Sequence, residues 1–188
     1  ARTLAEHGAD VLMVTAEQLP QTQYFVMDTS HGKRTTFLDL NVGSEKETLV
    51  KLIKDADVFS QGYRPGAMVR HGLSPEEVAL IRPGIIYTSM NCYGFEGPFA
   101  NRAGWEQLAQ TVTGIAAEQG GNQPRLLPAA ACDYTTGYLA AFGTLLAMGM
   151  RAREGGSYHV KASLCQSGMF IQRQRRVDYL SEELDIDH

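Results

Sequence analysis

Asp133 is the residue whose type and position point most directly to chemistry. It ends a run of small residues, Ala129–Cys132, and precedes an apolar stretch, Tyr138–Met150, that has the length and composition of a buried helix. As a helix N-cap, its carboxylate would accept hydrogen bonds from free N–H groups, and the helix dipole would keep it ionised. As a nucleophile, the same ionised carboxylate would attack an activated carbonyl. On this motif alone, the cap is the stronger interpretation.

Basic side chains gather in two other segments, each next to a glycine. An arginine in such a loop can pair with a phosphate through its planar fork, although a solvated basic turn is the stronger interpretation for any one of these residues. The candidate side chains for an anionic ligand are Lys33, Arg34, Arg64, Arg70 and His71, with Tyr63 beside them.

The composition favours a single globular domain that has no general affinity for polyanions. The 188 residues are 44% hydrophobic and 20% charged, and the net charge of -4 gives no reason to expect nucleic acid or an anionic membrane as a partner. Cys92, Cys132 and Cys165 form no CxxC pair, which argues against a disulfide framework or a zinc site. The scattered histidines show no ligand spacing, so we expect no metal, and we expect a reducing, cytoplasmic location.

Short apolar strands alternate with helical segments along the chain. This alternation predicts an α/β fold with a parallel sheet covered by helices on both faces. Ligands of such sheets bind beyond the carboxyl ends of the strands, so the loops 61–66 and 91–97 should form the rim of a site. The predicted strands are Val11–Val14, Val58–Phe59, Ile85–Tyr87 and Tyr158–Leu164.

The remaining elements are helices and a loop. Two helices should begin at capping boxes, Ser44 with Glu47 and Ser74 with Glu77, and a last helix should cover Gln166–Leu180. Residues 17–34 should form a polar loop.

Several common catalytic motifs are missing from the sequence. It contains no G-x-G-x-x-G, no Walker loop, no H-E-x-x-H and no G-x-S-x-G. The missing glycine fingerprint argues against a nucleotide-binding oxidoreductase, in spite of the α/β pattern.

Taken together, the segments resemble the class III coenzyme A transferase family, also called the CaiB/BaiF family. The resemblance covers nearly the whole chain and is carried by motifs in a fixed order. They are Leu4–Val11, Gly32–Arg34 with Leu38–Leu40, Ala56–Phe59, Tyr63–Gly66, Gly72-Leu73, Ile86-Tyr87, Gly94–Pro98, and Asp133 with Gly137.

The resemblance implies a Rossmann-like large domain, a smaller second domain and an interlocked homodimer. Residues 1–188 would form part of the large domain, without its first strand and without the small domain. A glycine-rich loop that shields the active site in the family would also lie outside this chain.

The resemblance also implies a reaction and its substrates, an acyl-CoA and a carboxylic acid. In the transferases, the aspartate that matches Asp133 attacks the thioester, and an aspartyl-CoA thioester follows. The family's racemases pair that aspartate with a histidine, and Trp105 stands at the histidine's position, where an indole cannot exchange the proton. Glu106 would line the acyl pocket or lie on a helix surface.

For coenzyme A itself, the resemblance places Arg70 and Tyr63 at the nucleotide end and makes Lys33 and Arg34 weaker candidates. Gly62 replaces the asparagine that the family often has before the Arg-Pro-Gly turn. Two alternatives to the transferase remain: a racemase-like isomerase, and a non-catalytic fragment in which Asp133 only caps its helix.

Overall fold

The computed structural model describes residues 1–19 and 22–176, and these form an α/β fold built on parallel strands. The strands are β1 (Val11–Thr15), β2 (Lys33–Phe37), β3 (Val58–Gln61), β4 (Ile86–Asn91) and β5 (Tyr158–Ser163). The helices are α1 (Arg2–Glu6), α2 (Gln23–Thr29), α3 (Gly43–Lys54), α4 (Ala67–Arg70), α5 (Pro75–Ile81), α6 (Glu106–Val112), α7 (Ile115–Gly120), α8 (Ala131–Glu154) and α9 (Leu164–Gln172). Among the described residues, no helix is long and apolar enough to span a membrane.

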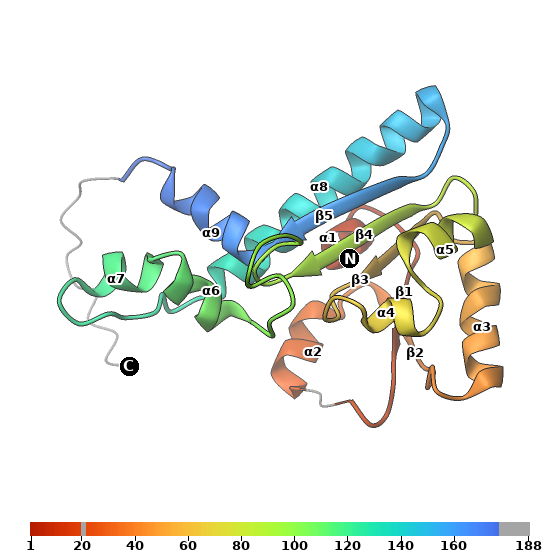
Figure 1. The fold of residues 1–188 in the computed structure, drawn as a ribbon, viewed down its shortest axis with the longest axis horizontal. Coiled ribbons are helices and arrows are strands. Elements are labelled where there is room, and N and C mark those ends of the chain that lie inside the picture. The colour runs from red at the N-terminus through yellow and green to blue at the C-terminus, as the bar shows by residue number, and fades with distance from the viewer. Residues whose placement is uncertain (20–21, 177–188) are drawn as a thin grey trace.

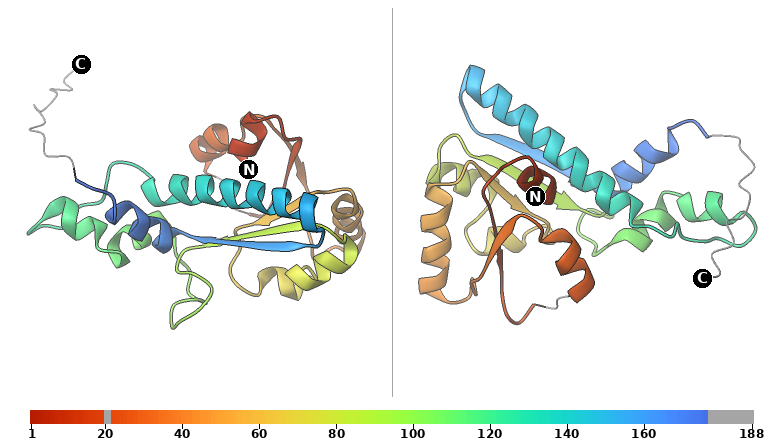
Figure 2. Two further views of the ribbon diagram at one scale, coloured as in Figure 1. Left: turned by 90° about the horizontal axis from the view of Figure 1, so that it is seen from above. Right: turned by 180° about the vertical axis from the view of Figure 1, so that it is seen from behind.

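The strands pair in two parallel groups. β1 pairs with β2, and β3, β4 and β5 pair side by side in that order. Helix α8 lies along one face of the three-stranded sheet, and α4 and α5 lie on the other (Figures 1 and 2). The predicted fold class, a parallel sheet with helices on both faces, is confirmed.

Alternate residues of β4 face the two helical layers. Tyr87 belongs to the core formed with α3, α4 and α5, and its hydroxyl donates to the Leu73 carbonyl at 2.9 Å. The next residue, Thr88, faces α8 and shares a hydrogen bond of 2.9 Å with the Thr144 hydroxyl. The same alternation puts Ser89 and Asn91 on the Tyr87 face.

The predicted polar loop at 17–34 is wrong in part, because it contains α2 and the start of β2. Strand β2 has the sequence Lys-Arg-Thr-Thr-Phe and is half exposed, so it lacks the apolar run that marks the other strands. Pairing with β1 orders it as a strand despite this composition.

Two predicted helix boundaries are also corrected. The long helix begins at Ala131 rather than Tyr138, because the small residues before Asp133 join its first turn. The last helix begins at Leu164 and ends at Gln172, so residues 173–176 lie beyond it. The rest of that prediction, residues 177–180, lies outside the described part of the chain.

One of the two predicted capping boxes is confirmed. The Glu77 N–H donates to Ser74 Oγ at 3.2 Å, and the Ser74 N–H donates to the Glu77 carboxylate at 2.8 Å, with Pro75 at the first helical position. The box at Ser44 is wrong, because α3 begins at Gly43 and Ser44 lies inside its first turn. A glycine that joins the helix displaces the predicted cap by two residues.

These two serines make a matched pair of substitutions. Ser74→Ala should lower the free energy of unfolding by about 1 kcal/mol, because it removes a working cap. Ser44→Ala should change it by less than about 0.5 kcal/mol, because alanine is a better helix former at an exposed position. Urea unfolding of both variants would check this, and equal losses would contradict the assigned helix starts.

Candidate active site

Asp133 lies in the first turn of α8, beyond the carboxyl ends of β4 and β5 (Figure 1). Both strands end at this edge of the sheet, and α6 and α9 pack around it. The position agrees with the rule that ligands of parallel sheets bind beyond the strand ends.

Glu106, the first residue of α6, supplies the acceptors for the start of α8. The Cys132 N–H donates to Glu106 Oε1 at 3.0 Å, and the Asp133 N–H donates to Glu106 Oε2 at 2.6 Å. The Glu106 side chain is buried, with 5% exposed. The interpretation of Asp133 as the N-cap is therefore wrong, because the helix starts two residues before it and a carboxylate from another helix binds its N–H.

Gln110, one turn further along α6, holds Glu106 in place. Its Nε2 donates to Glu106 Oε1 at 2.6 Å and to the Ala129 carbonyl at 3.1 Å. Its Oε1 accepts the Leu127 N–H at 2.8 Å. The sequence analysis missed Gln110, although its i, i+4 spacing from Glu106 was the available signal.

The Asp133 carboxyl group has an unusual proton affinity. Its side chain reaches solvent on one side, but burial against the protein, followed by the negative charge of Glu106, raises its pKa from 3.8 to about 6. These two effects outweigh the helix dipole, which was expected to favour ionisation. At neutral pH the group is still mostly a carboxylate, and its raised basicity suits nucleophilic attack.

The first N–H groups of α8 are not available to a reaction. Those of Cys132 and Asp133 bind the Glu106 carboxylate. Stabilisation of an oxyanion must therefore come from other donors.

A pocket of about 190 Å³ opens beside the end of β4, and neither Asp133 nor Glu106 is among its lining residues. It brings together three of the predicted site residues, Tyr63, Arg64 and Trp105, where the two predicted rim loops meet. Trp105 is also the N-cap residue of α6, so the pocket wall continues directly into Glu106. The lining residues are Gly62, Tyr63, Arg64, Pro65, Asn91, Cys92, Arg102, Ala103, Gly104 and Trp105.

Gly104 fixes the approach of this wall to the sheet. A Cβ atom at position 104 would lie 2.5 Å from Cys92 Sγ and 2.8 Å from the Tyr93 ring. Because residue 104 has no side chain, the segment before α6 can pass directly over the end of β4. This close approach sets the positions of Trp105 and Glu106 at the start of α6.

Arg102 adds a second cation to the pocket, and the sequence analysis missed it. Its guanidinium lies 4.4 Å from the centre of the Phe99 ring, a cation–π contact that holds the side chain at the rim. Arg102 lies a few residues after the predicted rim loop 91–97. Its Phe-x-x-Arg spacing after a glycine-rich turn was the only local signal.

The other predicted basic residues do not line this pocket. Arg70 and His71 follow at the end of α4, and the Arg70 guanidinium folds back toward Gly66 in the rim loop. Lys33 and Arg34 lie on β2 in the other sheet, where Arg34 forms a 2.5 Å ion pair with Asp10. Burial, and then the charge of Arg2, lowers the pKa of Lys33.

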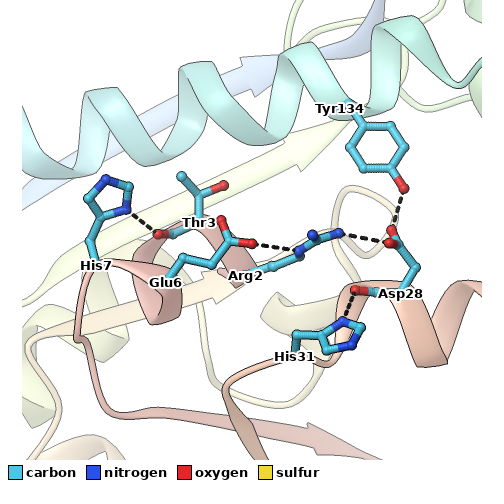
Figure 3. Close-up of polar contacts among 7 residues, drawn as sticks. All are labelled: Arg2, Thr3, Glu6, His7, Asp28, His31 and Tyr134. Carbon is cyan, nitrogen blue, oxygen red and sulfur yellow. Dashed lines mark hydrogen bonds and ion pairs between the residues drawn. The ribbon is translucent and has the colours of Figure 1, made fainter.

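Tyr134, the neighbour of Asp133, connects the first turn of α8 to α1 and α2 (Figure 3). Its hydroxyl donates to Asp28 Oδ2, and Asp28 Oδ1 accepts from Arg2 at 2.8 Å. Arg2 also pairs with Glu6 at 2.8 Å. The Tyr134 hydrogen bond is the main cause that lowers the pKa of Asp28. This partly exposed network fixes the outer side of the helix start, and Glu106 fixes the inner side.

Comparison with known proteins assigns this chain to a family. Residues 1–187 match the model of CoA-transferase family III. The chain belongs to that family.

Individual relatives agree with this assignment. Over 180 residues the chain is 40% identical to the acetyl-coenzyme A transferase nodX of Hypoxylon pulicicidum, a match that covers 92% of this chain and 30% of the relative. It is 29% identical over 161 residues to the acetyl-CoA:oxalate CoA-transferase of Acetobacter aceti, covering 84% of this chain and 41% of the relative. The structure of a CaiB/BaiF family protein from Brucella suis superimposes with a TM-score of 0.84 at 27% identity, covering 92% of this chain and 50% of that one. The chain thus spans 30% to 50% of the length of these relatives.

The raised pKa of Asp133 gives a stability test that separates a free carboxylate from a cap. A carboxyl group whose pKa is higher in the folded state stabilises the fold only while it is protonated, so its contribution is lost as the pH rises from about 4 through about 6. The free energy of unfolding of Asp133→Asn, minus that of the unchanged protein, should therefore increase when the pH is raised from 4 to 7.5. Urea unfolding at the two pH values measures this. If Asp133 were an ionised cap, this difference in the free energy of unfolding would instead decrease as the pH rises.

Proposed function

We propose that the full-length protein is an acyl-CoA:carboxylate CoA-transferase with Asp133 as its nucleophile. The observation that carries the proposal is that the two carboxylates, Glu106 and Asp133, have different roles. Glu106 binds the N–H groups of the helix start, and within residues 1–19 and 22–176 no side chain or backbone group hydrogen-bonds the Asp133 carboxylate.

The reaction that fits this site exchanges CoA between two acids through Asp133. The Asp133 carboxylate attacks the acyl-CoA thioester, which forms a mixed anhydride and expels the CoA thiolate. The thiolate then attacks the aspartyl carbonyl, giving an aspartyl-CoA thioester and the first free acid. The incoming carboxylate attacks this thioester, and the same two steps in reverse release the new acyl-CoA and restore Asp133.

The surrounding residues have distinct parts in this proposal. Glu106 and Gln110 act as positioning residues, because they set the helix start that carries Asp133. Arg64 and Arg102 give the pocket two positive charges that suit the phosphates of coenzyme A. Trp105 supplies an apolar wall, 57% exposed, between the pocket and Glu106, where an acyl group would lie. No step requires a metal.

The two alternatives are weaker on specific grounds. A racemase-like isomerase needs a second proton carrier at position 105, and tryptophan has no basic atom there. A non-catalytic fragment would explain Asp133 as a structural cap, and Glu106 already has that role.

We also propose that the protein works in the cytoplasm as a homodimer. Support for a partner comes from one side of α8, where large apolar side chains are exposed in the described structure. Tyr138, Phe142, Leu145 and Leu146 are each between 52% and 60% exposed. A second subunit, or chain beyond residue 188, would cover them.

Steady-state kinetics of the full-length protein tests the proposed nucleophile. Asp133→Asn should lower the rate of CoA transfer by at least about 10³-fold, because an amide cannot form the anhydride. For the unchanged protein, kcat/KM should fall tenfold per unit below pH about 6, as Asp133 becomes protonated.

Asp57→Asn is the matched control, because Asp57 is an exposed carboxylate at the opposite end of the sheet, paired with Arg151. It should retain transfer activity. Comparable rates for Asp133→Asn and the control would exclude Asp133 as the nucleophile.

A further inference from the structure

A hydrogen-bonded chain of side chains crosses all three strands of the β3–β4–β5 sheet. Gln61 Nε2 on β3 donates to Ser89 Oγ on β4 at 3.2 Å. Ser89 Oγ in turn lies 2.9 Å from His159 Nε2 on β5. Ser89 is buried, with 3% exposed, whereas Gln61 is half-buried and the His159 side chain reaches solvent. We call Gln61, Ser89 and His159 the cross-strand chain.

The hydrogen bonds of the cross-strand chain lead from the sheet to the backbone of Tyr63. The Gln61 carbonyl oxygen accepts the Tyr63 N–H at 2.8 Å, which turns the amide NH₂ toward Ser89. Ser89 Oγ accepts that bond, and its contact with His159 Nε2 can run in either direction according to the tautomer of His159.

Tyr63 opens the loop that carries part of the pocket wall. Gly62 to Pro65 line the pocket, and Gly66 ends the segment in the left-handed region at φ +80°. Tyr63 itself is 43% exposed, so packing alone holds it weakly. The bond from the Tyr63 N–H to Gln61 ties the start of this loop to the sheet.

We propose that the cross-strand chain is a positioning device, which sets the Tyr63–Arg64 segment against the pocket and thereby its affinity for coenzyme A. The identity of the ligand rests on the proposed function. The mechanical part, control of the loop by His159 and Ser89, rests on the hydrogen bonds alone.

The surroundings of His159 favour its neutral form. Lys161 on the same strand and Glu76 on α5 are the charged groups that act on His159, and the rings of Tyr87 and Phe95 flank it at 5.3 and 6.3 Å. Burial, and then Lys161, lowers the pKa of His159, and Glu76 opposes them.

Two variants of the full-length protein break the cross-strand chain at different points, and one variant controls for stability. Ser89→Ala removes the central hydroxyl, and His159→Phe removes the ring nitrogen that bonds Ser89 while keeping a flat ring. Thr88→Val is the matched control, because it removes a buried hydroxyl from the next position of the same strand, where the side chain bonds Thr144 on the opposite face.

Amide hydrogen exchange at Tyr63 measures the loop directly. Exchange should speed up about fivefold in Ser89→Ala and His159→Phe, the factor that corresponds to one neutral hydrogen bond, and should not change in Thr88→Val. The dissociation constant for coenzyme A, measured by calorimetry, should rise by a similar factor in the same two variants, with kcat unchanged at saturating acyl-CoA. Unchanged Tyr63 exchange in both variants, or an equal change in Thr88→Val, would overturn the proposal.

The exchange measurement separates this inference from the proposed function. Tyr63 exchange needs no ligand and no turnover, so it responds to the cross-strand chain even if Asp133 proves not to be the nucleophile. If CoA transfer depends on Asp133 while Tyr63 exchange stays constant in both variants, the transferase assignment stands and the positioning role is lost.

Discussion

The first backbone N–H groups of α8 need acceptors, and the buried carboxylate of Glu106 supplies them. A buried carboxylate without partners would be strongly destabilising, but Glu106 accepts hydrogen bonds from Cys132, Asp133 and Gln110. The contact joins α6 to α8 across 27 residues of sequence and fixes where α8 begins. Asp133 owes its position, its free carboxylate and part of its raised pKa to this one interaction.

The pocket and the carboxylate pair form one continuous structure. Gly104 brings the chain close over Cys92 at the end of β4, Trp105 turns into α6, and Glu106 reaches the start of α8. Arg64 and Arg102 line the same pocket as Gly104 and Trp105, so two cationic side chains lie beside this path.

The sequence predicted the parts of the molecule that local patterns specify. The apolar strands, the capping box at Ser74 and the meeting of the two rim loops are confirmed, since each depends on residues close together in the chain. Strand β2 was missed because its polar residues gain their strand structure from pairing with β1. The cap, which the local motif alone favoured for Asp133, is wrong for a similar reason. Nothing near Asp133 in sequence shows that Glu106 will occupy its N–H, because that contact exists only once α6 and α8 have packed.

Mass spectrometry of the full-length protein, incubated with a short panel of acyl-CoA thioesters and then mapped by peptide, tests the central claim most directly. If Asp133 is the free carboxylate of the pair, CoA should be found attached through a thioester to Asp133, and Glu106 should stay unmodified. A full-length protein that turns over these thioesters while Asp133 stays unmodified, or that carries the adduct on Glu106, would contradict the assignment of the two carboxylates.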